Sequence, residues 1–411
     1  MVYLVINFLL YLTFLLYTLR KDKFVASNLY MYIIWLTGAF FSILYYDTPF
    51  FKLVGHVADL SLFPFLYIFV LFVCFYESVK LKENIGKVHY CRSPLIKPLI
   101  LILAITAVIP FVENVKEIFM GRFDITEISD IKSEYTEGDL DSRYYMSWLG
   151  ARLQGVSSRF YFLSPILLFY YLSISKKTNR YICIGLVLSV LNPVLNGIII
   201  GGRGVMASTV LYLVLLFFFF RNTLPLRIKK IIKKVIYGIG VFIGAFFILT
   251  TIYRFTSSRY DSFTLTDWIV RYFGESFSNF NTECWHFTDN TWGRNTLANI
   301  FENDGLRHWM ELQKITHIRM NVYFTMFGDL LLDFGYYLAP VIVLILCLIC
   351  RSVRPHKGDV SLVSLIIFSL FSYIFIEGLF IWPLINRNTA AFTTIVIAAL
   401  IKFSEKQWKF Q

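Results

Sequence analysis

An arginine set among glycines is the first residue pattern in this chain that could bind an anion. Gly201-Gly202-Arg203-Gly204 lies between the apolar runs 181–200 and 205–220. Arginine presents five donors in a fixed fork that suits phosphate and carboxylate, and glycine lets the backbone approach a ligand closely. We therefore expect Gly202, Arg203 and Gly204 to hold a phosphate group. The alternative is an arginine that only extends to lipid headgroups.

Three more arginines occur where apolar runs end. Arg254 and Arg259 are five residues apart, and Arg387 is the sole cation of a short loop beside Trp382 and Pro383. A cation held at membrane depth is costly and therefore a functional candidate. Each could equally bind ordinary lipid headgroups. Glu377, inside an apolar run, should face the protein interior and could pair with Arg387 or Arg203.

Three residues are candidates for a general base. His317 precedes Arg319 and Asn321, and an imidazole there could deprotonate a hydroxyl. Asp329 and Asp333 are four residues apart, so on a helix they share one face. They could act as a base or accept a sugar hydroxyl, or they could only hold arginines or cap a helix. Glu275 is the third candidate, and the sequence does not choose among His317, Asp329 and Glu275.

The elements that position these residues must be membrane helices. The 411 residues are 57% hydrophobic and only 16% charged, whereas soluble domains carry about 25% charged residues. Backbone polar groups in lipid must be satisfied within the segment, so the apolar stretches should be helices and the fold all-α. Eleven stretches are predicted to span the membrane: 2–19, 29–46, 60–76, 95–112, 158–175, 181–200, 205–220, 235–252, 336–350, 360–380 and 389–403.

Lysines and arginines alternate between the loops. The loops after odd-numbered stretches carry at least three each, and those after the second, sixth and tenth carry one each, Lys52, Arg203 and Arg387. This is the positive-inside pattern, and it predicts an outer N-terminus and a cytoplasmic C-terminus. The clustering between apolar runs also explains the net charge of +12 without nucleic acid.

Two long loops then face outward within a single membrane domain, 1–411. Residues 113–157 are acidic, and residues 253–335 mix both charges with four tryptophans. Loops of this length without structure are uncommon unless functional. Apolar spacing predicts short interfacial helices at 267–280 and 304–315, with Thr266 and Asp304 as N-caps.

The sequence gives no sign of a metal or a cofactor. No HExxH pattern and no metal-ligand spacing of His, Cys, Asp or Glu is present, and no nucleotide-binding glycine fingerprint occurs. Cys347 and Cys350 have CxxC spacing but lie in an apolar run, where small buried hydrophobes are expected. We predict no bound metal and no cofactor.

The chain resembles the Wzy-type polymerases of O-antigen and capsule repeat units. The resemblance is carried by the turn 201–204, by the stretch from Asn321-Val322-Tyr323 to Asp333-Phe334-Gly335 after a long loop, and by the layout of eleven stretches. It implies a GT-C-like helical bundle in the bacterial inner membrane. It also implies an inverting, metal-independent transfer of the growing glycan from undecaprenyl pyrophosphate to a hydroxyl of an incoming lipid-linked unit.

The resemblance also suggests roles for residues and partners. Arg203 matches the position of a pyrophosphate-holding arginine, and Arg254, Arg259 and Arg387 join it by topology. Arg319, Asn321, Tyr323, Asp333 and Glu377 are expected to orient the substrate. Undecaprenyl-pyrophosphate-linked oligosaccharide, the bilayer and a chain-length regulator protein are the expected partners.

Two other functions stay open. An O-antigen ligase would share the layout, and the stretch 321–335 favours the polymerase over it. A transporter or flippase of lipid-linked sugars would predict internal repeats, short loops and charges at mid-membrane. The 83-residue outer loop from 253 to 335 and the lack of an evident repeat argue against that class.

Overall fold

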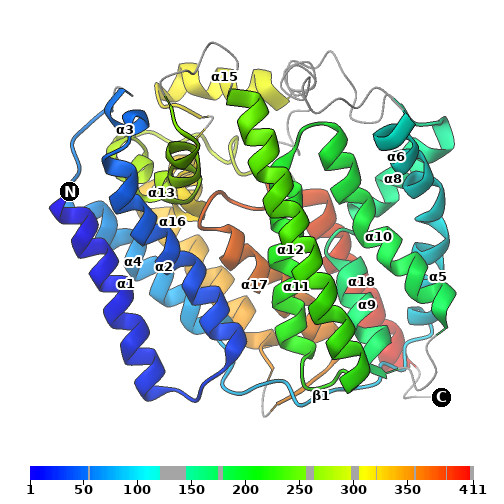
Figure 1. Cartoon of the computed structure of the whole chain (residues 1–411). Helices are drawn as coiled ribbons and strands as arrows, with labels where there is room; N and C mark the ends of the chain where they lie inside the picture. Colours follow the sequence, from blue (N-terminus) through cyan, green and yellow to red (C-terminus); the bar gives the residue numbers. More distant parts are fainter. Residues whose placement is uncertain are drawn as a thin grey trace. The chain divides into compact units, whose positions relative to one another are not determined.

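The computed structural model describes residues 1–53, 56–120, 145–174, 179–255, 263–297, 305–320, 322–355, 358–385 and 387–407. Helices make up almost all of the regular structure there, joined by a single pair of two-residue strands (Figure 1). Six helices are long and apolar enough to cross a membrane, and three shorter ones are also apolar. The chain is therefore an α-helical membrane protein.

The chain divides into two compact units, each built from segments distant in sequence. The first unit comprises Met1–Glu83, Phe255–Arg354 and Phe371–Asn388. Its elements are α1 (Val2–Lys21), α2 (Ala26–Tyr46), α3 (Pro49–Leu53), α4 (Leu62–Val79), α13 (Leu265–Thr282), η1 (Cys284–His286), α15 (Gly305–Thr316), α16 (Thr325–Val353) and the end of α17 (Leu362–Glu377).

The second unit comprises Asn84–Arg254, Pro355–Leu370 and Thr389–Gln411. Its elements are β1 (Lys87–Val88), α5 (Ile96–Thr106), α6 (Val108–Met120), α8 (Trp148–Arg159), α9 (Leu163–Ile174), α10 (Arg180–Ile199), α11 (Arg203–Phe220), α12 (Leu226–Phe255), β2 (Asp359–Val360), the start of α17 and α18 (Asn388–Gln407).

Each of the eleven predicted apolar stretches falls on helix, but two boundaries differ in an instructive way. The stretch 95–112 is broken at Ala107 into α5 and α6. Pro110 follows in the first turn of α6, where a residue without an N–H group is tolerated. Helix α6 then continues to Met120, so the segment after 112 begins as helix rather than loop. Helix α9 has only 12 residues, because α8 occupies the chain up to Arg159.

Aromatic packing forms the core of the first unit. The Trp35 ring lies 5.2–6.1 Å, centroid to centroid, from the rings of Phe72, Phe277, Phe327 and Phe375. Its indole Nε1 donates a hydrogen bond to the Phe375 carbonyl at 2.8 Å. Buried tryptophan normally finds such a partner, because an unpaired N–H in an apolar core is costly. These contacts join α2 to α4, α13, α16 and α17.

Helix α13 packs tightly on α2. A Cβ atom built on Gly274 would lie 2.3 Å from the Phe41 carbonyl oxygen, so the close approach requires glycine. Every residue from Gly274 to Thr282 is buried, which is deeper than an interfacial helix would lie. Thr264, not the expected Thr266, caps the helix, through a capping box with Asp267. The other expected cap, Asp304, lies outside the described residues.

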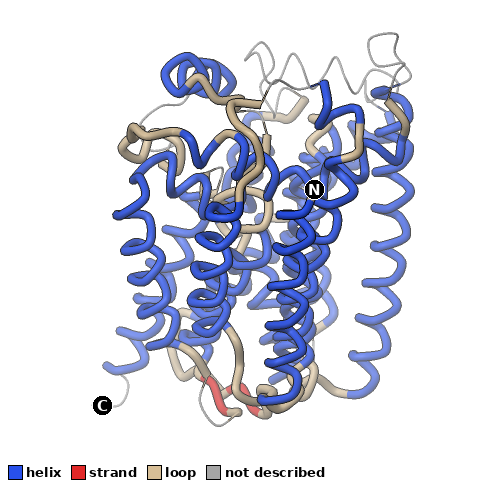
Figure 2. The backbone as a smooth tube through the Cα atoms, turned by 90° about the vertical axis from the view of Figure 1, so that its left-hand side faces the viewer, coloured by secondary structure: helices blue, strands red, loops and turns tan. Residues whose placement is uncertain are grey.

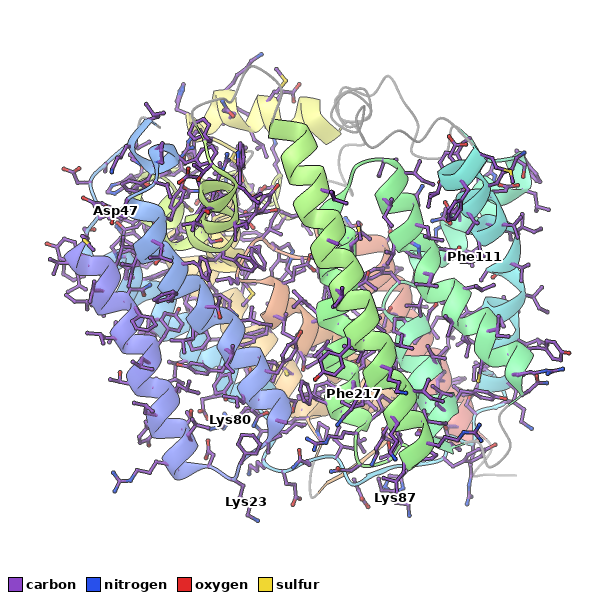
Figure 3. The ribbon with its side chains drawn as sticks, in the orientation of Figure 1. Lys23, Asp47, Lys80, Lys87, Phe111 and Phe217 are labelled. Carbon is purple, nitrogen blue, oxygen red and sulfur yellow. The ribbon has the colours of Figure 1, made fainter. Side chains whose placement is uncertain are left out.

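In each unit the lysine-rich loops gather at one end. In the first unit Lys80 Nζ lies 2.8 Å from Asp22 Oδ2, and Arg354 donates to the carbonyls of Glu77 and Lys80. Figure 3 shows Lys23 and Lys80 at one end of this unit and Asp47 at the other.

In the second unit β1 pairs in parallel with β2, and Ser93 bonds Ser404 at 2.6 Å. Figure 2 shows the strands at one extremity of the helices. Lys87 and Phe217 lie toward this end and Phe111 toward the other (Figure 3). Loops predicted to share a side of the membrane therefore meet within each unit.

Candidate functional site

Two ion pairs on and after α13 form the charged centre of the first unit. Arg271 Nε lies 2.9 Å from Glu275 Oε2, one turn along the helix. Arg319 Nη2 donates to Glu283 Oε1. Tyr45, near the C-terminal end of α2, lies close to all four charged groups. We refer to Arg271, Glu275, Glu283 and Arg319 as the charge network.

The carboxylates of the charge network are buried while its arginines reach solvent. Side-chain exposures are 5% for Glu275 and 2% for Glu283, against 25% for Arg271 and 26% for Arg319. Arg271 also stacks over the rings of Phe50, at 4.9 Å, and Trp268, at 5.4 Å. The carboxylates thus fix the arginines from beneath and leave their outer edges to meet a ligand.

Burial raises the pKa of Glu275, although Arg271 and then Arg319 act in the opposite direction. The Tyr323 backbone also hydrogen-bonds this carboxylate and lowers its pKa. The Tyr323 carbonyl accepts from Asn279 Nδ2 at 3.3 Å. Residue 323 therefore ties the loop before α16 to α13 through its backbone, where the sequence had suggested a substrate-orienting side chain.

His56 joins the network, and sequence reasoning missed it as a lone residue in a short loop. Its Nδ1 lies 3.1 Å from Thr282 Oγ1 and 3.8 Å from Glu283 Oε1. Its Nε2 lies 2.9 Å from the Phe51 carbonyl. A carbonyl only accepts, so Nε2 carries a proton. No sequence motif marks the approach of His56 to Glu283.

Arg319 keeps donors for a ligand. Its Nε is buried and has no hydrogen-bond partner within the described part of the chain, and its described ion pair uses Nη2 alone. The described contacts engage one N–H of the terminal nitrogens, so donors on Nη1 and Nη2 remain for an anion. Asn321, which was expected to act beside it, lies outside the described residues.

Asp329 and Asp333 hold loops onto α16. Asp333 accepts from the backbone N–H groups of Asn295, at 2.9 Å, and Thr296, at 2.6 Å, and from the Thr291 hydroxyl. Asp329 accepts from Asn295 Nδ2 at 2.9 Å and from the Trp382 N–H at 2.6 Å. Both are buried, at 3% and 0% exposure. These contacts give both carboxylates a structural task.

Glu377 pairs with Arg387, one of the two arginines proposed as its partner. Arg387 Nη1 lies 2.8 Å from Glu377 Oε2 and also donates to the Tyr373 hydroxyl. The turn between them is fixed to the start of α16, because the Met326 N–H donates to the Gly378 carbonyl at 2.7 Å. The Tyr323 and Phe380 rings are 5.7 Å apart. This pair is therefore anchored close to the loop that carries Arg319.

His317 is exposed and stands at the end of α15. Its backbone has φ of 55°, a left-handed conformation that ends the helix, and its N–H donates to the Gln313 carbonyl at 2.9 Å. Only Ile318 lies between it and Arg319 in the sequence. Its imidazole is thus the most accessible of the three base candidates.

The glycine–arginine turn belongs to the second unit. The Gly202 N–H donates to the Gly197 carbonyl at 2.7 Å, and the Gly201 N–H donates to the Ile198 carbonyl at 3.0 Å. These two bonds make a Schellman motif that ends α10, and Gly201 supplies its left-handed residue with φ of 67°. The left-handed backbone of Gly201 therefore explains why a glycine stands there, without a ligand. From the sequence alone, this structural role could not be distinguished from ligand binding.

Helix α11 begins directly at Arg203, with Gly202 as N-cap. The first N–H groups of a helix lack intrahelical partners, and its N-terminus favours anions. A Cβ on Gly204 would meet nothing within 4 Å, so the backbone there is open. The side chains of Arg203 and Arg254, and all of Arg259, lie outside what the structure describes.

A polar cluster next to this turn was not predicted. The Tyr145 hydroxyl donates to Asn114 Oδ1 at 2.6 Å and accepts from Asn196 Nδ2 at 3.0 Å. Asn196 also supplies the carbonyl that accepts the Ile200 N–H at 3.2 Å. The cluster fixes the end of α10 to the segment after α6. Asn114 and Asn196 are 82 positions apart in the sequence, so no local pattern reveals this cluster.

Neither unit offers a metal centre in the ranges described: no three His, Cys, Asp or Glu side chains lie together there. Comparison with protein-family models, curated proteins and solved structures yields no match to this chain.

Proposed function

We propose that this chain polymerises lipid-linked oligosaccharide repeat units at the outer face of a bacterial inner membrane. The growing glycan passes from undecaprenyl pyrophosphate to a hydroxyl of an incoming undecaprenyl-pyrophosphate-linked unit. The carrying observation is the charge network, in which buried Glu275 and Glu283 hold two arginines with outward donors. Such preorganised cations stabilise a diphosphate as it gains negative charge.

The reaction is an inverting substitution at the anomeric carbon. The acceptor oxygen forms a bond to that carbon, and the bond to the diphosphate oxygen breaks with its electron pair leaving on the diphosphate. A base takes the hydroxyl proton. The sugar diphosphate is already activated, so no nucleotide is consumed. Arg319 and Arg387, both in the first unit, are the proposed diphosphate ligands. Arg203, in the second unit, stays a predicted phosphate ligand on its own helix N-terminus.

His317 is the proposed general base. His317 is exposed and lies two positions before Arg319 in the sequence, whereas Glu275 is paired with Arg271 and both oxygens of Asp329 already accept hydrogen bonds. Glu275 then acts by positioning Arg271, and Asp329 acts by holding Asn295 and the Trp382 backbone in place. The proposal includes interaction of the chain with a chain-length regulator protein.

The proposal also includes eleven crossings in a GT-C-like bundle, with the N-terminus periplasmic and the C-terminus cytoplasmic. The coincidence of all eleven apolar stretches with helix supports this count. The meeting of lysine-rich loops at one end of each unit supports the orientation.

A deletion strain tests the function directly. Its surface glycan, separated on a gel, should show core carrying a single repeat unit, with long chains restored by the wild-type gene. Complete loss of glycan from the core would identify a ligase instead. Repeat units trapped inside the cell would identify a flippase.

A further inference from the structure

The turn between α11 and α12 borders a basic hollow of about 380 Å³. Unlike the charge network, the hollow has no carboxylate among the lining residues that the structure describes. Four cations line it: Arg221, Lys229, Lys230 and Lys233. Phe217 and Leu226 supply apolar wall. All of these residues belong to the second unit.

The positive charge of this hollow is uncompensated. Residues 221–234 contain six cations and no acidic residue. None of the six forms an ion pair with any residue that the structure describes. Like charges crowded around a hollow repel one another, and an anion inside would relieve that repulsion.

We propose that this hollow binds the phosphate headgroup of an anionic glycerophospholipid. The lipid, rather than a free phosphate, is indicated by the apolar side chains in the wall of the hollow. Leu226 lines the hollow and is 77% exposed, and Phe217, which also lines it, belongs to an apolar helix. A headgroup among the lysines would place its acyl chains along these side chains. Basic clusters at helix ends recognise anionic lipids in this way.

The chain supplies a matched control for the test. Arg227 and Lys234 belong to the same charge run but do not line the hollow. The double variant Lys229→Gln/Lys233→Gln removes two lining cations, and Arg227→Gln/Lys234→Gln removes the same charge nearby. Full-length protein in neutral detergent is titrated with phosphatidylglycerol, and retained lipid is counted by native mass spectrometry. Phosphatidylcholine and inorganic phosphate are parallel arms.

The proposal expects phosphatidylglycerol to bind the wild-type chain, and the lining variant to bind it about 30-fold more weakly. The control variant should bind phosphatidylglycerol less than about 10-fold more weakly than the wild-type chain. Phosphatidylcholine should bind weakly to the wild-type chain and to both variants. Equal losses in both variants would mean diffuse surface attraction and would overturn the site. Displacement of the lipid by millimolar inorganic phosphate would overturn the choice of a lipid. Size-exclusion profiles confirm that each variant is folded.

Discussion

Nε of Arg271 lies 2.9 Å from Oε2 of Glu275, on one face of a helix whose next turns are wholly buried. Removing the arginine leaves a carboxylate in the core without its partner, which typically costs about 3 kcal/mol or more. Arg271→Met should therefore lower the thermal unfolding midpoint in detergent strongly. The double variant Arg271→Met/Glu275→Leu should recover most of the loss. Arg152→Met, at an exposed site, should change the unfolding midpoint little. If Arg152→Met lowered the midpoint as much as Arg271→Met, the Arg271–Glu275 pair would not be a stabilising element of the core.

The raised pKa of Glu275 gives a pH dependence with a definite sign. A carboxyl group with a folded-state pKa above its unfolded value binds its proton more tightly in the folded chain. That contribution is complete below the unfolded value, about 4.3, and is lost as pH rises through the folded pKa. Compared with Glu275→Gln, the wild-type chain should lose stability as pH increases from about 4. The unfolding midpoints of the wild-type chain and of Glu275→Gln are measured from about pH 4 upward. A difference between the two midpoints that does not change with pH would contradict the raised pKa of Glu275.

Asp333 receives three donors, so an amide cannot replace it. Asp333→Asn would point an NH₂ group at the backbone N–H of Asn295 or Thr296 and should cost roughly 2–3 kcal/mol. Asp329→Asn should cost less, because the remaining oxygen can still accept from the Trp382 N–H and the side-chain amide of Asn295 can turn to accept from the new NH₂ group. Thermal unfolding measures both. A stable Asp329→Asn chain that makes no polymer would restore Asp329 as a candidate base.

Arg319 should be needed for polymer in addition to pairing with the buried Glu283 carboxylate. Arg319→Ala should reduce long-chain glycan to below about 1% of wild type, the loss expected for one donor to a developing oxyanion. Arg319→Lys should recover only part, since a lysine lacks the planar fork. Arg152→Ala serves as the charge-matched control. Full-length glycan from Arg319→Ala, with protein at normal levels in the membrane, would discard the charge network as the site.

The turn before α11 separates a structural glycine from a functional one. Gly204→Ala meets no atom within 4 Å and adds helix propensity of up to about 1 kcal/mol, so the chain should fold as well as before. If a diphosphate approaches this backbone, polymer should nevertheless decrease, as it should in Arg203→Ala. Gly238→Ala, equally open on α12, is the control. Wild-type chain length in both Gly204→Ala and Arg203→Ala would exclude the turn from the mechanism.

The helices could be read from the sequence because each apolar stretch carries its own signal. The run from Tyr181 to Ile200 predicts α10 with little help from distant residues. The break at Ala107 was missed because Pro110 stands at a position compatible with either one helix or two. Thr264 was missed as a cap by two residues, a usual boundary error.

The site was less predictable, because its pairings are long-range. Arg387 and Glu377 were both singled out, and their pairing could be proposed because they are only ten positions apart in the sequence. Glu283 and His56 gave no local signal, because each contacts a residue that is distant in the sequence. Glu283 pairs with Arg319, and His56 contacts Thr282. The structural task of Asp333 depends on backbone N–H groups at 295 and 296, which no side-chain pattern encodes.

Trp35 is synthesised early, yet the carbonyl that accepts its indole proton comes from residue 375, 340 positions later. Its ring neighbours Phe277 and Phe327 also emerge only after residues 84–254 of the second unit have been made. The first unit must therefore close around an interruption longer than either of its own major segments. A chain truncated before residue 375 would lack the carbonyl that accepts the Trp35 N–H. Its N-terminal helices would then be incompletely packed, and we expect quality-control proteases to degrade it.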